Sequence, residues 1–80
     1  MDKTLAVMAI VVKNIESAEK VNALLHTAGD YIVGRMGIPY KDRSLSVISV
    51  ILDADPKIIN SLSGKLGMLD GVKCQVLTTK

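Results

Sequence analysis

The sequence predicts an α+β domain whose elements follow the order strand, helix, strand, strand, helix, strand. Two mostly apolar runs, residues 5–12 and 44–52, have the length and β-branched content of buried strands. Two other segments repeat apolar residues at helical spacing behind a residue that can cap a helix. Residues 72–78 alternate in the manner of a half-exposed strand.

Residues 5–12 are continuously apolar and end in three β-branched side chains, which suits a central strand better than a short helix. Asn14 follows as a helix cap, with Glu16 and Glu19 in the first turns. Apolar residues then recur at helical spacing at Ala18, Val21, Leu24, Leu25 and Ala28. We expect this first helix to stop at Gly29.

Residues 31–38 look extended but contain Gly34 and Gly37, which weaken a strand and indicate an edge position or a bulge. Residues 39–43 are predicted to turn the chain. Residues 44–52 are again apolar on both sides of the pleat, which predicts a second central strand.

The second helix is predicted from Asp55 as N-cap and Pro56 at the first helical position, where the missing N–H has no cost. Its buried stripe consists of Ile58, Ile59, Leu62, Leu66 and Leu69. Asp70 and Gly71 form a turn into the last strand.

With right-handed crossovers, this order folds into a ferredoxin-like βαββαβ sandwich, an antiparallel sheet of order 4-1-3-2 with two helices on one face. The first and third strands then lie in the middle, and both lack polar alternation. Because both helices already cover one face, we expect the open face to be covered by another copy or a partner domain. The expected state is a homo-oligomer, a dimer or a tetramer.

Composition sets limits on function. The chain has 80 residues, enough for one domain over residues 1–80, and its single Cys74 excludes an internal disulfide. A net charge of +2, spread along the chain, disfavours nucleic acid and membrane surfaces as partners. The apolar run 5–12 is too short to span a bilayer and runs into a charged stretch without a cleavage site. We therefore expect a cytoplasmic location.

Two motifs go beyond simple core patterning. Residues 31–40 read Tyr-Ile-Val-Gly-Arg-Met-Gly-Ile-Pro-Tyr, and residues 62–67 read Leu-Ser-Gly-Lys-Leu-Gly. With residues 44–52 and 70–72, these motifs resemble the iron-only hydrogenase system regulator family of small ACT-like proteins. The resemblance covers nearly the whole chain.

This resemblance implies a ferredoxin-like fold related to ACT domains and to the ligand-binding domain of the nickel-responsive repressor, with oligomeric assembly. ACT domains that bind amino acids usually have a glycine between the first strand and first helix. Here that loop reads Lys13-Asn14-Ile15, which counts against amino-acid binding.

Candidate ligand-binding residues fall in these two motifs. Arg35, Lys41 and Arg43 flank the Pro39-Tyr40 pair and form a candidate anion patch, with Tyr40 stacking on a planar ligand. Gly64 and Gly67 can let a ligand or a neighbouring backbone approach, with Lys65 facing an anion. The predicted ligand set is Gly37, Pro39, Tyr40, Arg43, Gly64, Lys65 and Gly67.

Structural alternatives are open for both groups. The cations of the turn are equally consistent with solubilising charges, because Asp42 lies among them. Gly64 is also explained by close packing of the helix on the sheet, and Gly67 by helix termination. Met8, Met36 and Met68 are predicted to fill gaps in the core.

No catalytic constellation is visible, and we expect a protein that is not an enzyme. His26 and Cys74 are single soft ligands without metal-binding spacing, so we predict no metal site, unless subunits share one, and the sequence names no cofactor. The favoured function is a regulatory or small-ligand-sensing module. A purely structural assembly domain is the main alternative.

Two other functions of this topology are disfavoured. The RNA-recognition motif shares the order of elements but stacks bases on aromatic residues of its central strands, which are lacking in residues 5–12 and 44–52. A metal chaperone would need a pair of cysteines after the first strand, where this chain has residues 13–16, Lys-Asn-Ile-Glu.

Overall fold

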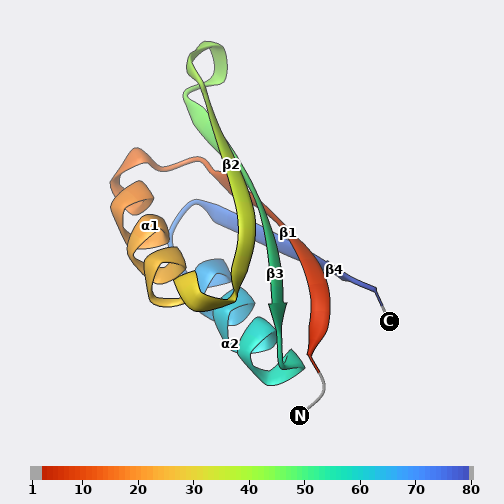
Figure 1. Cartoon of the computed structure of the whole chain (residues 1–80). Helices are drawn as coiled ribbons and strands as arrows, with labels where there is room; N and C mark the ends of the chain where they lie inside the picture. Colours follow the sequence, from red (N-terminus) through yellow and green to blue (C-terminus); the bar gives the residue numbers. More distant parts are fainter. Residues whose placement is uncertain (1–2, 80) are drawn as a thin grey trace.

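The computed structural model describes residues 3–79, which form one sheet and two helices (Figure 1). The strands are β1 (Thr4–Val12), β2 (Ile32–Tyr40), β3 (Leu45–Ala54) and β4 (Val72–Thr78), and the helices are α1 (Ala18–Thr27) and α2 (Pro56–Gly67). Short 3-10 turns connect them: η1 (Ile15–Ser17), η2 (Gly29–Tyr31) and η3 (Lys41–Arg43). The predicted order of elements is confirmed.

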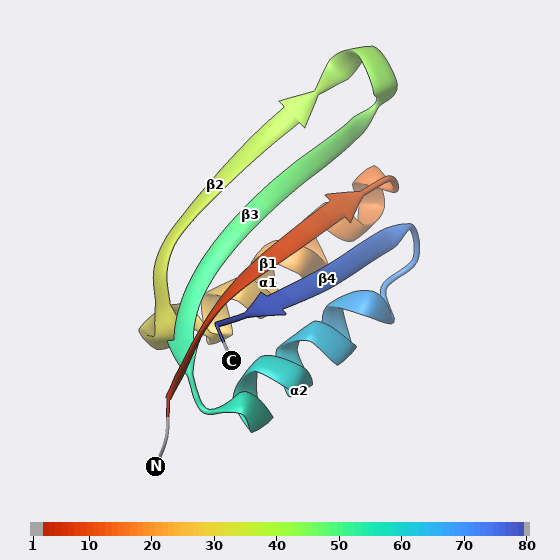
Figure 2. The ribbon, with the colours of Figure 1, turned by 90° about the vertical axis from the view of Figure 1, so that its right-hand side faces the viewer.

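The sheet is antiparallel with strand order β2-β3-β1-β4, and both helices lie on one face (Figure 2). This is the predicted order read from the other edge. The register places Thr4 opposite Ala54 and Val12 opposite Ser46, so β1 pairs with β3 along its whole length. β2 is an edge strand with an irregularity between Ile32 and Gly34, as the glycines in this segment predicted.

The core lies between the sheet and the helices. β1 alternates buried and more exposed residues, and its buried side includes Met8 and Ile10, both 0% exposed. The helices contribute Val21, Leu25, Ile59, Leu62 and Leu66 to the same core. Fully burying such aliphatic side chains contributes about 1.5–3 kcal/mol each. The core is therefore built by one side of each element.

Of three local predictions, two need correction and one is confirmed. Asn14 caps the 3-10 turn η1, accepting a hydrogen bond from Glu16 N, and α1 begins only at Ala18. The stop predicted at Gly29 is confirmed, because α1 ends at Thr27 with Ala28 as its C-cap and Gly29 is the next residue. Pro39 and Tyr40, predicted in a turn, are the last residues of β2, because they pair with Ser46 and Leu45.

Two packing predictions were also wrong. Met8 fills the core, but Met36 is 62% and Met68 87% exposed. Gly64 does not allow close helix packing, because a Cβ added to it would meet no atom within 4 Å. The outer side of α2 at Gly64 faces open space. The termination predicted at Gly67 is confirmed as the end of α2.

The β2–β3 hairpin projects beyond the rest of the sheet (Figure 1). β1 ends at Val12, opposite Ser46, whereas β2 and β3 continue to the pair Tyr40–Leu45 and the turn η3. We call residues 40–45 the arm. The molecule is correspondingly elongated, with extents of 41 × 19 × 19 Å.

Candidate functional site

Among the described residues, two surfaces are candidates for binding: an exposed apolar sheet face and a groove at the end of β1. The first is the sheet face opposite the helices, which we call the open sheet face. Strand register places on it Leu5, Val7, Ala9 and Val11 of β1, Val47, Ser49, Ile51 and Asp53 of β3, Met36 and Ile38 of β2, and Lys73, Gln75 and Leu77 of β4.

The open sheet face is largely apolar. Val7 and Ile51 are opposite each other on the two central strands and are each 40% exposed. The flanking Leu77 is paired with Val7 and is 73% exposed. The charged side chains on this face, Asp53 and Lys73, lie toward opposite ends of the sheet. Antiparallel sheets exposed to water normally alternate apolar and polar residues, so this face has the composition of a buried layer.

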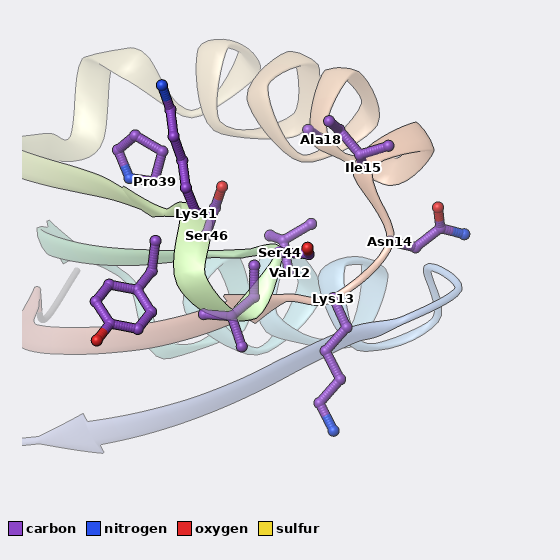
Figure 3. Close-up of a pocket in the computed structure, with 11 residues that line it drawn as sticks. Val12, Lys13, Asn14, Ile15, Ala18, Pro39, Lys41, Ser44 and Ser46 are labelled. Carbon is purple, nitrogen blue, oxygen red and sulfur yellow. The ribbon is translucent and has the colours of Figure 1, made fainter.

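The second surface is a groove at the end of β1, beneath the arm (Figure 3). It has a volume of about 710 Å³. One wall is the segment from β1 to α1, with Val12, Lys13, Asn14, Ile15 and Ala18. The other wall is the hairpin, with Pro39, Tyr40, Lys41, Ser44, Leu45 and Ser46. We call this cavity the end groove. It exists because the hairpin continues past the end of β1 while α1 starts late.

The loop wall of the end groove is firmly held. Lys13 N donates to Gly71 O at 2.7 Å, and Asn14 Nδ2 donates to Asp70 Oδ2 at 3.0 Å. Ser17 Oγ donates to the backbone oxygen of Asp70 at 2.7 Å. These three bonds tie the loop after β1 to the turn before β4. This contact could not be predicted from a local motif, because the bonded residues are more than fifty positions apart in the sequence.

Gly71 is required at this junction. Its φ is +70°, and an added Cβ would lie 2.7 Å from Asn14 Cβ. Positive φ and close approach are both properties that favour glycine. The Asp70-Gly71 pair, predicted only as a turn, therefore also positions the loop wall.

The hairpin wall also contains a residue whose backbone has the left-handed conformation, as Gly71 does at the loop wall. Ser44 ends the turn η3 with φ 53° and donates its backbone N–H to Lys41 O at 3.1 Å. Lower in the hairpin, Arg35 Nη2 donates to Asn22 Oδ1 on α1 at 2.8 Å. This hydrogen bond connects the edge strand to the helix layer and leaves Arg35 outside the end groove.

A smaller groove of about 250 Å³ lies between the two helices. Thr27, Tyr31, Lys57, Ser61 and Lys65 contribute polar atoms to its lining. Leu24 and Leu62 are among the apolar residues at its base. We call it the helix groove.

The predicted ligand residues do not form a single site within one copy of the chain. Pro39 and Tyr40 line the end groove, and Arg43 lies in the adjacent turn without lining it. Lys65 lines the helix groove. The two grooves lie at opposite ends of α1, since Ala18 lines one and Thr27 the other.

The predicted glycines occupy other positions. Gly37 lies in β2 opposite Ile48, where an added Cβ would be 3.8 Å from the Ile48 side chain. Gly64 and Gly67 are exposed on α2 and do not line either groove. Any molecule that approaches these two residues comes from outside the fold described here.

Sequence reasoning did not assign Lys13, Ser44, Leu45 or Ser46 to a site. Leu45 and Ser46 are the first residues of β3, and Ser44 precedes them. Lys13 follows β1, so no motif joins all four. The strands predicted over residues 5–12, 31–38 and 44–52 are nearly equal in length, so they did not indicate that the hairpin continues past β1.

Cys74 and His26 lie on different elements, β4 and α1. Burial raises the pKa of the Cys74 thiol above its usual range, and a hydrogen bond with Ser63 opposes the rise. The Sγ–Oγ distance of this hydrogen bond is 3.7 Å. A raised pKa keeps the thiol protonated at neutral pH and therefore a poor nucleophile. His26 is exposed on the helix surface.

The topology and the single helical layer define a ferredoxin-like α+β domain. The chain belongs to the TM1266-like family, described as "Iron-only hydrogenase system regulator, putative", whose family model matches residues 4–76. The resemblance deduced from the two motifs is confirmed. No curated protein matches the sequence.

A solved structure provides a close comparison. The uncharacterized protein TM1266 from Thermotoga maritima is 32% identical, with a TM-score of 0.94. The match covers 99% of this chain and 100% of that protein's chain. In the part of the chain that the structure describes, no helix is long and apolar enough to cross a membrane.

Proposed function

We propose that this chain is a non-enzymatic regulatory module of the iron-only hydrogenase system that assembles with copies of itself and responds to a small ligand. The family description supports the regulatory role and the link to the hydrogenase. The observation that carries the assembly is the apolar open sheet face. The ligand site we favour is the end groove, with Pro39, Tyr40 and the nearby Arg43 retained from the predicted set.

Self-association explains the open sheet face because a second copy presents the same apolar surface. Val7 and Ile51 lie near its middle, and Asp53 and Lys73 lie toward its ends. An in-plane two-fold axis that reverses strand direction brings the Asp53 end of one sheet over the Lys73 end of the other. The same packing buries the central aliphatic side chains.

Regulation follows if ligand and assembly are coupled. A ligand that binds one assembly state more tightly shifts the population toward that state by its differential affinity. The arm connects the two surfaces, because β2 and β3 carry part of the open sheet face and then continue to the end groove. A ligand held against Tyr40 would therefore contact the strands that form the interface.

The assembly is tested by size-exclusion chromatography with light scattering on the full chain. We expect a dimer or a tetramer at micromolar concentration. Ile51→Lys should raise the dissociation constant by about tenfold or more, because it places an ammonium in the contact. Met68→Lys is the matched control, since Met68 is 87% exposed on another part of the surface. A monomeric wild-type protein would contradict the proposal, as would an unchanged mass for Ile51→Lys.

A structural assembly domain without a ligand is the second candidate, and the open sheet face supports it equally well. Native mass spectrometry of freshly purified protein separates the two. A retained small molecule of defined mass supports the sensing function. Assembled protein with only the mass of the polypeptide, and no shift in assembly with added metabolite mixtures, supports the structural function.

A further inference from the structure

The open sheet face has a pattern of rows that is nearly symmetric about its middle. A row consists of the residues that the register places side by side across the strands. On the two central strands the middle row is small, with Ala9 opposite Ser49. The rows on either side of it are larger and apolar on the same strands: Val7 with Ile51, and Val11 with Val47. A surface that packs on its own copy about a two-fold axis needs such a pattern, because each row meets the row at equal distance on the other side of the axis.

The arm continues the open sheet face past the end of β1. Along β2, Met36, Ile38 and Tyr40 lie on the open side and are 62%, 51% and 47% exposed. The register pairs Tyr40 with Leu45, which shares the side of Val47 because it lies two residues away on β3. An overhang with water on both sides has no reason to keep one side apolar. The apolar side of the arm therefore calls for the same cover as the sheet.

Opposite charges lie at the two ends of this face. Lys13 follows β1 at the arm end, and its side chain points away from Pro39 and Lys41 (Figure 3), which places it on the open side. Asp53 lies on the open side at the opposite end. Residues 45–53 of β3 separate the two ends by about 26 Å at a rise of about 3.3 Å per residue. The two charges therefore cannot pair within one copy.

A two-fold axis along the middle row would bring these ends together. It reverses the strand direction but keeps the lateral order of the strands, so that β3 lies over β3 of the second copy. Leu45 then packs on the row of Asp53 of the second copy, with Tyr40 on one neighbouring strand and Lys13 on the other. A phenol hydroxyl and an ammonium flank the carboxylate, and the symmetry repeats the contact at the other end.

The contact has the extent of a stable interface. With strands about 4.8 Å apart and about 3.3 Å per residue, the four strands beside residues 45–53 cover a footprint of roughly 500 Å². Stable complexes bury about 800 Å² of accessible surface on each partner. Because a side-chain surface is rougher than its footprint, the two areas are of the same order.

We propose that two copies pack with their open sheet faces together about a two-fold axis along the Ala9–Ser49 row, and that the arm of each copy covers the Asp53 end of the other. This inference rests on the proposed self-association and specifies its geometry. Lys13 and Tyr40 of one copy bind the Asp53 carboxylate of the second copy. The arm is therefore part of the interface.

Charge exchange between the two ends tests this pairing on the full chain. Asp53→Lys alone and Lys13→Glu alone should each raise the dissociation constant of the dimer about tenfold, because both contacts of the dimer become repulsive. An equimolar mixture of the two variants has complementary charges at both contacts. Native mass spectrometry, which separates the species by mass, should show the mixed dimer well above the statistical half.

Lys65→Glu is the matched control for the charge change. It lies on α2, in the helix layer on the other side of the sheet, so it should not weaken the dimer or form mixed dimers preferentially with Asp53→Lys. Tyr40→Phe removes only the hydroxyl and should weaken the dimer by about fivefold or more, because two hydrogen bonds are lost. Circular dichroism of each variant distinguishes a weaker dimer from an unfolded chain.

The mixture also separates this geometry from self-association in general. Preferential mixed dimers support the axis and the arm contact, since Lys13 and Asp53 cannot meet within one copy. A dimer that Ile51→Lys weakens and neither charge variant affects would retain the self-association and overturn the assigned axis. Weakening by both charge variants without preferential mixing would overturn it as well. A monomeric wild type would reject the self-association and this geometry together.

Discussion

Gly71 is a residue whose replacement should have a large local effect. It combines φ +70° with a distance of 2.7 Å between an added Cβ and Asn14 Cβ. We expect Gly71→Ala to lower the free energy of unfolding by about 1–3 kcal/mol, from backbone strain and displacement of the loop. Chemical denaturation measures this change. A stability equal to that of the wild type would show that the junction adjusts without cost.

Gly64→Ala should have the opposite sign. Gly64 lies inside α2, and an added methyl group meets nothing within 4 Å. Ala is favoured over Gly in a helix by about 1 kcal/mol, so the variant should be more stable by up to that amount. A higher melting temperature together with weaker assembly or ligand response would show that a neighbouring molecule approaches this glycine, as the motif first suggested.

Cys74 should make the stability depend on alkaline pH. Burial raises its pKa in the folded chain above the ordinary value of 9.0. As pH rises past that value, the unfolded chain loses the thiol proton first, so the folded state becomes less stable until the folded thiol also ionises. Cys74→Ala should lack this component. The test compares the free energy of unfolding of the wild type and of Cys74→Ala by chemical denaturation at pH 8 and pH 10. The wild type should lose more stability between the two pH values than the variant does.

At the scale of elements, the hairpin should be the least protected part of the sheet. β2 has one paired neighbour, and its residues beyond Ile32 are all exposed. The arm continues past the end of β1, whereas β1 pairs on both sides. We expect amides of residues 40–45 to exchange hydrogen orders of magnitude faster than those of β1 in mass-spectrometric or NMR exchange. Comparable protection would show that the arm is covered, by a second copy or another molecule.

At the scale of the whole molecule, stability and assembly should be linked. A native state that is an oligomer unfolds to monomers, so its melting temperature rises with protein concentration. A tenfold dilution should lower the melting temperature by about a few degrees for a domain of this size. Ile51→Lys should remove the concentration dependence. A melting temperature independent of concentration in the wild type would argue against self-association.

Residue type was sufficient to predict features that depend only on neighbouring residues in the sequence. Asp55 accepts a hydrogen bond from Lys57 N and Pro56 opens α2, as their types predicted. The bulge near Gly34 and the edge position of β2 also followed from composition. The exposure of Met36 and Met68 did not, because hydrophobic type alone does not specify which side of a strand or which end of a helix faces the core.

The order of elements, the strand order and the apolar character of both sides of the central strands could all be predicted from the sequence. These properties depend on periodicity, caps and connection handedness, which are local or topological. The positions at which the candidate ligand residues meet became clear only from the folded chain. Pro39 and Tyr40 come to the loop of Lys13 because β1 ends before the hairpin does, and Gly64 remains outside because α2 turns it to open space. Such juxtapositions depend on relative lengths and packing angles of distant segments, which no short motif encodes.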